Sequence, residues 1–452
     1  MDALINVHNT TAQEAGRPAL PTDPGSIFVL VTTLLVFFGP LFVLFPPFPP
    51  SKSDALTETH NKLGPEPARS NLTRENNKKN KNAKEGGQGS SSISSLFVYP
   101  VEPCRGVELA RAKLTPAGLE FDHLFHLAQL RSPFPVSTTS ASAAADDAET
   151  DADASSPARR HTWEAITPRQ FPLLATVEVE LWRPDLAKIK GFRDVTAGSS
   201  NEVFLILRFP WRAEGVWRGL WDVFAAKCSR GWRAQPVVEV MLPVACPRPG
   251  EIAEKGYAFE EKSKVVALNM GCELPEELRL YLGVSNKLAL FRVDPVGLRE
   301  VYDTSVPRGE DSGRAQPVLG FQDPYPVHVT SLASLRDLES KQTKKESKAG
   351  LSLTEQSRAN IFVSGLSPCD EHGWKKIKAK PEGSQELHEV AFQVSSRTHR
   401  SEPDSNSGAP TTDNLGVQML PLFENVDSHE NFIEVSMSIE VLDQDEHVYK
   451  RQ

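Results

Sequence analysis

The feature that most constrains the fold lies at residues 95–129, where short apolar runs alternate with turn-forming residues. The apolar run 96–98 leads into Tyr-Pro-Val at 99–101 and a Cys-Arg-Gly turn at 104–106, and Gly-Leu-Glu-Phe-Asp at 118–122 comes before a second apolar run. Short apolar runs bounded by Gly, Pro and Asp are typical of strands joined by turns. This part of the chain is therefore predicted to be β-structure.

Further strands are predicted along the chain. Residues 173–182 turn to alternation of apolar and polar side chains, 203–209 form another apolar run, and 415–419 and 433–442 alternate with period two. Alternation with this period places apolar side chains on one face of a sheet. The chain is therefore expected to be an α+β protein that consists mainly of strands.

One helix is predicted between these strands, at 214–228. Trp217, Leu220, Trp221 and Phe224 lie at positions i, i+3, i+4 and i+7, so one helical face is apolar. Two interpretations fit this face: a helix that packs on a barrel, which we favour, and a surface that docks on a membrane.

A membrane anchor is predicted near the N-terminus. The sequence from Gly25 to Ser51 contains no charged residue, and a mostly apolar run begins at Ile27 and ends at Phe45. Such a run is about 28 Å long as a helix, which is close to the hydrocarbon thickness of a bilayer. A secretory signal needs a basic start, whereas the segment before this run has three acidic residues and only Arg17, and prolines follow the run, so cleavage is disfavoured. We therefore expect a single transmembrane helix.

The orientation of this helix follows from its flanks. Arg17 is the one basic residue before it, whereas eight Lys and Arg residues lie between 52 and 84. The positive-inside rule places the large folded part in the cytosol. The basic residues after the span are solvated in one interpretation and touch anionic lipid headgroups in another. The mitochondrial outer membrane and the endoplasmic reticulum both remain open as locations.

Composition excludes several classes of protein. The formal net charge of -9 argues against a nucleic-acid binder. The five cysteines are scattered without a C-x-x-C pair, which favours reduced thiols over a disulfide framework or a zinc site. Phosphate loops of the G-x-x-x-x-G-K-[ST] type, G-x-S-x-G and H-E-x-x-H are absent from the sequence, so nucleotide hydrolysis and zinc proteolysis have no support.

The motif at 95–129 and three downstream motifs resemble MOSC proteins, whose MOSC domain follows an N-terminal MOSC β-barrel. The downstream motifs are Thr-Pro-Arg-Gln-Phe-Pro at 167–172, Phe-Gln-Asp-Pro-Tyr-Pro at 321–326, and Arg-Ala-Asn-Ile-Phe-Val-Ser-Gly at 358–365 with Trp374 after it. The order and spacing are most similar to fungal MOSC proteins and to the mitochondrial amidoxime-reducing component.

The resemblance implies a domain order. An N-terminal MOSC β-barrel is followed by a MOSC β-barrel, and a disordered tether joins them to the anchor. The expected segments are a non-cytosolic tail at 1–26, a transmembrane anchor at 27–46, the tether at 47–92, the N-terminal barrel domain at 93–300 with a disordered insertion at 136–160, and the MOSC domain at 301–452.

The resemblance also implies a cofactor and the residues that bind it. MOSC enzymes of this type bind the molybdenum cofactor, whose pterin carries a phosphate, and pyridoxal phosphate enters only through association with sulfurases that carry a separate domain. Each implied arginine has an alternative role as a structural ion-pair residue, and the Asp and Asn have one in turn capping. The implied cofactor-binding residues are Arg105, Arg169, Asp323, Arg358, Asn360, Arg397 and Arg400.

This sequence departs from the family pattern at three positions. Ser401 stands where the family's metal-ligand cysteine is expected, and a serine hydroxyl is a hard ligand that does not ionise readily, so no metal ligand is certain. Glu102 replaces a lysine, and His123 follows Asp122 where Arg is usual. An acid in place of a base repels a phosphate.

The expected function is that of a membrane-anchored molybdenum-cofactor oxidoreductase, which reduces a small N-hydroxylated substrate with electrons from partner redox proteins. The alternative is a catalytically silent MOSC module that binds a pterin or a protein. The partners expected are the membrane, through residues 27–45, an electron donor and a small-molecule substrate, with no nucleic acid.

Overall fold

The computed structural model describes most of the chain and leaves several stretches out. Contacts divide it into two compact units, 1–50 and 51–452, which are treated separately. The described residues are 24–44, 51–65, 69–72, 91–131, 162–189, 202–212, 215–246, 255–258, 266–270, 274–301, 318–322, 325–341, 354, 357–381, 388–397, 416–422 and 431–444.

The described residues of the first unit form the helix α1 (Pro24–Leu44), which has no charged residue and contains Pro40. Its apolar side chains, among them Phe28, Val36 and Phe37, are exposed. The helix predicted here is confirmed. Among the residues that the structure describes, no helix qualifies as long and apolar enough to cross a membrane. The transmembrane role of residues 27–46 therefore stays a prediction.

The second unit is built around a closed barrel of seven strands. The strands follow one another in the order β17-β16-β20-β19-β18-β22-β2, and β2 pairs with β17 to close the ring. Apolar side chains such as Leu96, Val329 and Phe392 are fully or almost fully buried and belong to one core. The bounds are β2 (Ser92–Val98), β16 (Val327–Ser331), β17 (Ile361–Ser364), β18 (Trp374–Lys380), β19 (Val390–Arg397), β20 (Val417–Leu422) and β22 (Ser438–Gln444).

Two further sheets form a half-barrel from the residues that precede the MOSC-like part. One has four strands in the order β1-β8-β9-β10, and the other has five in the order β11-β12-β13-β6-β7. The bounds are β1 (His60–Lys62), β6 (Phe125–Arg131), β7 (Thr162–Ala165), β8 (Glu178–Pro184), β9 (Phe204–Pro210), β10 (Val237–Pro243), β11 (Lys255–Ala258), β12 (Val266–Asn269) and β13 (Leu288–Val293).

Short elements connect and cover these sheets. The remaining strands are β3 (Val107–Leu109) on β2, the group β21 (Phe432–Glu434), β4 (Arg111–Thr115) and β5 (Gly118–Leu119), and the pair β14 (Arg299–Glu300) and β15 (Val318–Leu319). The helices are α2 (Lys52–Leu56), η4 (Pro172–Thr176), α4 (Leu186–Ile189), α5 (Val216–Arg230), α6 (Glu276–Leu282), α7 (Leu332–Lys341) and η5 (Asp370–Gly373). The mainly β fold with some helices is therefore confirmed.

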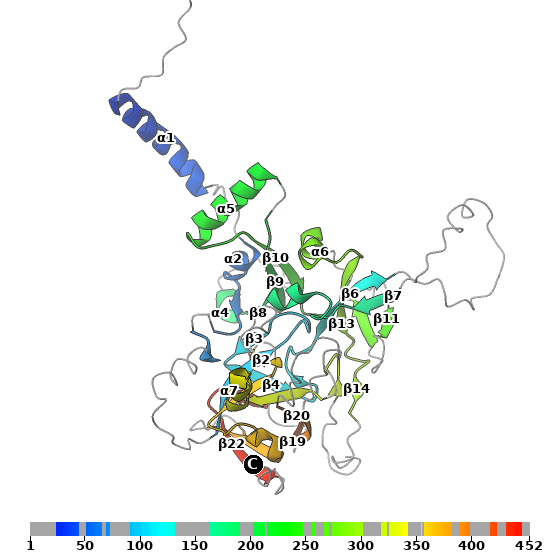
Figure 1. The fold of residues 1–452 in the computed structure, drawn as a ribbon. Coiled ribbons are helices and arrows are strands. Elements are labelled where there is room, and N and C mark those ends of the chain that lie inside the picture. Colours follow the sequence, from blue (N-terminus) through cyan, green and yellow to red (C-terminus); the bar gives the residue numbers. More distant parts are fainter. Residues whose placement is uncertain are drawn as a thin grey trace, which may run out of the picture. The chain divides into compact units, whose positions relative to one another are not determined.

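The division into 93–300 and 301–452 stays a prediction, but the two predicted parts share a strand. Strand β2 lies in the N-terminal part of the sequence, yet it pairs with β17 and β22 and completes the barrel of the C-terminal part (Figure 1). Its register places Leu96 opposite Ile361. The barrel therefore cannot be formed by residues after 300 alone. The insertion predicted at 136–160 lies outside the described residues.

The tether predicted at 47–92 is corrected in part. Residues 51–62 form α2 and β1, and β1 pairs with β8. Serine caps α2, since the Ser51 side chain accepts from the backbone of Asp54 and the Asp54 carboxylate accepts from the backbone of Ser51. The sequence signal for this capping box is the Ser and the Asp three residues later. Residues 73–90 lie outside the described residues.

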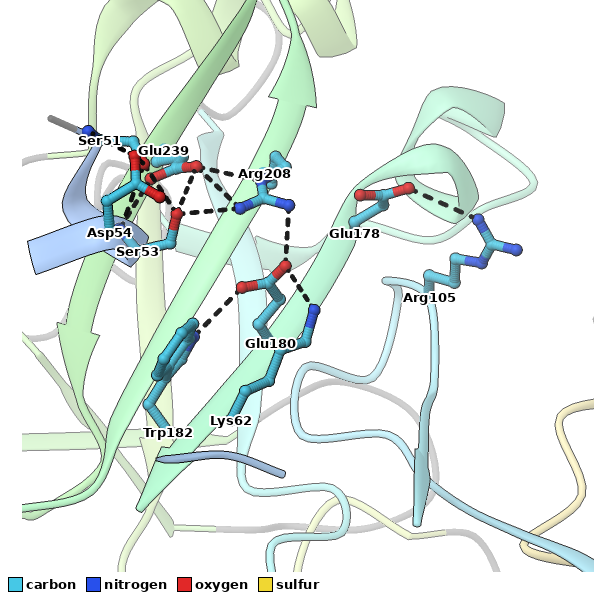
Figure 2. A network of polar contacts seen from close by, with 10 residues as sticks. All are labelled: Ser51, Ser53, Asp54, Lys62, Arg105, Glu178, Glu180, Trp182, Arg208 and Glu239. Carbon is cyan, nitrogen blue, oxygen red and sulfur yellow. Dashed lines mark hydrogen bonds and ion pairs between the residues drawn. The ribbon is translucent and has the colours of Figure 1, made fainter. Parts of the chain in front are cut away.

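A buried polar network fastens this segment to the four-stranded sheet (Figure 2). Arg208 of β9 contacts Glu180 of β8 at 2.8 Å and Glu239 of β10 at 2.8 Å. The Ser53 hydroxyl donates to Glu239 at 3.0 Å, and Lys62 contacts Glu180 at 2.8 Å. Buried charges need such partners to remain ionised. The segment after the predicted anchor is thus an integral part of the fold.

Helix α5 is confirmed, but the favoured interpretation of its apolar face is wrong. The side chains of Trp217, Leu220, Trp221 and Phe224 are exposed, whereas Gly219 and Ala226 on the opposite face are buried. The helix therefore presents its aromatic residues outward, and its buried residues on the opposite face are small.

Candidate functional site

The candidate site lies where the loop after β2 meets the residues before β17. Backbone hydrogen bonds hold the loop against the turn before β6: His123 donates to the carbonyl of Tyr99 at 2.9 Å, Phe125 to that of Pro100 at 2.8 Å, and Glu102 to that of Phe125 at 3.0 Å. His123 has a positive φ of 50°, a conformation that is uncommon for a residue with a side chain. The loop is therefore held by several contacts at once.

Asp122 is at the centre of the site. Its buried carboxylate accepts hydrogen bonds from the backbone of Tyr99 at 2.7 Å and from the Asn360 amide at 3.0 Å, and it contacts His123 Nδ1 at 2.7 Å. Asn360 also accepts from the backbone of His328 at 3.0 Å. Asp122 and Asn360 thus join the N-terminal turn to strands β16 and β17 of the barrel.

Arg358 forms a second connection beside the first. Its guanidinium donates to the backbone carbonyl of Cys104 at 2.9 Å and to that of Glu102, and it lies over the Tyr99 ring at 4.4 Å from the centroid. Its φ is 51°, which the surrounding contacts must maintain. Arginine suits this position because its planar group donates in two directions and stacks on an aromatic ring.

The environment changes the protonation of two groups in the site. The pKa of His123 lies above its usual value. Burial alone would lower it, but the charge and hydrogen bond of Asp122 and the charge of Glu102 have a larger, opposite effect. Burial raises the pKa of the Cys104 thiol to about 12, against a smaller opposite effect of Arg358. Cys104 is therefore a neutral thiol at neutral pH and is unsuited to bind a metal as a thiolate.

Of the predicted cofactor-binding residues whose side chains the structure describes, two lie together. Arg358 and Asn360 lie in the site, and both contact protein groups. Arg105 points to Glu178 on β8 at 3.8 Å, and both side chains are about half exposed (Figure 2). Arg169 is exposed in the turn before η4.

The remaining predicted residues cannot be placed. Asp323, Arg400 and Ser401 lie outside the described residues, and Arg397 is described only in its backbone, at the end of β19. These positions stay predictions.

Sequence reasoning missed one contact of the site. His126 Nε2 lies 3.7 Å from the Glu102 carboxylate, so this acid has a histidine beside it. A lone histidine in an apolar strand gives no sequence signal for this role. Glu102 and His123 depart from the family pattern in the sequence. In the structure Glu102 contacts His126, and His123 contacts Asp122.

The described residues do not fit a molybdenum cofactor as they stand. Arg358 already donates to two carbonyls, and the Glu102 carboxylate is unfavourable near a phosphate. Within the described ranges, no group of three or more His, Cys, Asp or Glu side chains is placed to hold a metal ion. The arrangement holds the loop after β2 against the barrel and keeps the Asp122–His123 pair at their junction.

Comparison with known proteins supports part of the resemblance. Residues 90–191 match the family model described as the MOSC N-terminal beta barrel domain. The matched region includes β2, Asp122 and His123 and covers less than half of the chain. Comparison with curated proteins found no match. A relationship to the amidoxime-reducing component or to fungal proteins therefore stays a prediction.

Proposed function

We propose that this chain is a catalytically silent MOSC-type binding module that is anchored to a membrane. The observation that carries the proposal is the environment of Arg358, whose guanidinium donates to two backbone carbonyls and stacks on Tyr99. An arginine with these contacts supports the fold and is not available for a phosphate. The serine at position 401, where the family has a cysteine, supports the same conclusion from the sequence.

A test of this proposal measures metal and pterin together. The full chain is purified and its molybdenum is measured by mass spectrometry, with pterin measured by fluorescence after oxidation. The proposal expects little molybdenum in the wild type. Ser401→Cys should raise metal retention, because a thiolate is a far better ligand for this metal than a hydroxyl. Ser405→Cys, close in sequence, is the matched control. Pterin in the wild type would identify the ligand, and its absence from both forms would favour a protein partner.

The second candidate function is the reduction of N-hydroxylated compounds with the molybdenum cofactor. The observation in its favour is the Asp122–His123 pair, since a histidine with a raised pKa can hold a proton, and such a reduction consumes protons. Stoichiometric molybdenum in the wild type, with turnover of an N-hydroxylated test substrate, would establish this function and refute the first.

Anchoring to the membrane forms part of the proposal. It is supported by the uncharged helix α1, whose apolar side chains are exposed around the helix, because a helix of this kind needs an apolar environment. We place the folded unit in the cytosol, at the mitochondrial outer membrane or the endoplasmic reticulum. The electron donor and the small-molecule substrate belong to the second candidate only.

Glycosylation mapping tests the orientation. Asn9 lies on the far side of the membrane in this proposal and should be glycosylated if the chain inserts in the endoplasmic reticulum. Asn71 is half buried, and its backbone donates to Glu108 at 2.9 Å, so the absence of a glycan on Asn71 would be weak evidence for the orientation. Asn82→Thr creates a second sequon, at Asn80. A glycan on Asn80 would refute the proposed orientation.

A further inference from the structure

We infer that α5 is a docking surface for an anionic membrane. The helix carries a stripe of apolar side chains that the fold leaves exposed: Trp217 is 86% exposed, and Leu220, Trp221 and Phe224 are each more than half exposed. At 100° per residue these four positions fall within about 100° of one another. Trp232, just after the helix, is 83% exposed and extends the apolar surface.

The burial pattern of the helix differs between its two faces. Gly219 and Ala226 are buried, and both lie on the side of the helix opposite the stripe. Glycines at both ends, Gly215 and Gly231, have positive φ values and let the chain enter and leave the helix sharply. In Figure 1, α5 lies at the periphery of its unit, beyond the ends of β9 and β10 that it connects.

Charge favours an anionic surface as the occupant. Residues 211–235 contain five basic and two acidic residues, although the whole chain has a net charge of -9. Among the described side chains, Arg212, Arg218 and Arg233 are exposed, and Lys227 lies over the Trp232 ring at 4.7 Å from the centroid. A helix with Trp, Leu and Phe on one face and cations at its borders is typical of segments that lie in the membrane interface.

Chain length gives a second argument, which rests on the anchoring proposed above. Six residues lie between Leu44, the end of α1, and Ser51, and the seven Cα-to-Cα steps from Leu44 to Ser51 span at most about 25 Å. Ser53 is fixed at the Arg208–Glu239 pair, two residues from the end of the β9–β10 hairpin where α5 begins. The chain that follows the predicted anchor is therefore fixed at the same end of this hairpin as α5.

The experiment uses the full chain with its anchor disabled, so that docking and anchoring are separated. Leu34→Arg with Phe37→Arg places two charges in α1, and flotation with lipid vesicles then measures peripheral binding. Vesicles of phosphatidylcholine with about one third phosphatidylserine should bind the protein, and pure phosphatidylcholine vesicles should bind it much less, because each cation near an anionic surface contributes favourably.

Two variants in this background test the surface itself. Trp217→Ser with Trp221→Ser should weaken binding at least about tenfold, since binding scales with the buried apolar area. Arg218→Glu with Lys227→Glu should weaken it about 100-fold or more on anionic vesicles, and the matched control Lys375→Glu with Lys376→Glu should change it little. Circular dichroism checks that every variant is folded.

The outcomes are distinguishable. Equal binding to both vesicle types, or binding that the tryptophan variant leaves unchanged, overturns the inference. A dimer in solution that the tryptophan variant converts to a monomer assigns the surface to a second copy and also overturns it. Carbonate extraction of the chain with an intact α1 tests anchoring alone. If extraction removes the chain while α5 still binds anionic vesicles, the anchoring proposal fails and the docking surface stands.

Discussion

Removing the charge of Arg208 should loosen the segment that follows the predicted anchor. Arg208 lies between two carboxylates that are each about 5% exposed, Glu180 and Glu239, and it also donates to the Ser53 hydroxyl at 3.1 Å. Arg208→Met keeps the apolar stem and removes the guanidinium. The carboxylate of Glu239 then lacks its cation, whereas Glu180 keeps Lys62 at 2.8 Å.

The expected magnitude follows from the burial of the pair. Removing one partner of a buried ion pair costs about 3–5 kcal/mol, because the other charge stays desolvated. The Arg208 side chain is 24% exposed and Lys62 remains, so we expect the lower end, about 3 kcal/mol. Arg131→Met is the matched control. Its ion pair with Glu164 is 62% exposed on the arginine side and should contribute less than about 1 kcal/mol.

Hydrogen exchange of residues 52–62, measured by mass spectrometry at pH 7.5, reports this change. A loss of about 3 kcal/mol in local opening free energy raises the exchange rate by roughly 100-fold. The double variant Arg208→Met with Glu239→Gln should recover part of the loss, since it removes the unpaired charge. An exchange rate no faster than that of the Arg131→Met control would refute the reasoning.

The effect should depend on pH. In the wild type, burial raises the pKa of Glu239, but the Ser53 backbone and Arg208 outweigh it and hold the pKa below its usual range. A carboxylate whose pKa is lowered by folding stabilises the protein at pH values above its pKa in the unfolded chain. This stability is lost as the pH falls through its pKa in the folded protein. Without Arg208, burial dominates and Glu239 is protonated more readily. The difference between wild type and Arg208→Met should therefore narrow between pH 7.5 and pH 5, and a constant difference would contradict this.

Three further predictions concern the barrel and the candidate site. Gly416→Ala should lower the melting temperature more than Gly231→Ala, because both have positive φ but an added Cβ at 416 meets a backbone carbonyl of β16, whereas the space at 231 is open. Cys104 should resist maleimide at pH 8 in the native protein while the exposed cysteines react, since its pKa is about 12, and rapid native labelling would contradict its burial. Asp122→Asn should lower the pKa of His123 in an NMR titration. In the wild type this raised pKa stabilises the protein at pH values below the pKa of an unfolded histidine, near 6.5. This stability is lost as the pH rises through the pKa of His123 in the folded protein, and the variant should lack this pH dependence of stability.

The sequence predicts the strands better than it predicts their partners. Residues 433–442 alternate as one strand would, yet they form β21 and β22, which are separated by a turn in which Ser436 has a φ of 80°. The two strands belong to different sheets, since β21 pairs with β4 and β22 pairs with β18 and β2. Alternation is a local property, whereas pairing with a strand more than 300 residues away is decided by the whole barrel.

The candidate site was predictable in its residues and not in their roles. Resemblance to the family singled out Arg358 and Asn360, and the structure places both at the junction of the loop after β2 with the barrel. Arg358 contacts the backbone carbonyls of Cys104 and Glu102 and Asn360 contacts Asp122, and these partners lie more than 230 residues away in the sequence. A motif identifies a residue type at a position, but tertiary contacts decide whether an arginine serves a ligand or the fold.

Helix α5 shows why the spacing of apolar residues does not decide whether an apolar helix face lies in the core or on the surface. Core helices and interfacial helices share the same spacing of apolar residues, so Trp217 and Phe224 alone do not separate the two. The exposed fractions decide between them, since Gly219 and Ala226 on one face are buried and the aromatic side chains on the other face are exposed. The aromatic stripe is therefore not part of the core. The Arg208 network also fixes Ser53, in the chain that follows α1, at the end of the β9–β10 hairpin from which α5 extends. We expect Arg208→Met, which loosens this network, to weaken binding of the chain with intact α1 to vesicles if α1 and α5 bind the same bilayer. Unchanged binding is expected if they do not.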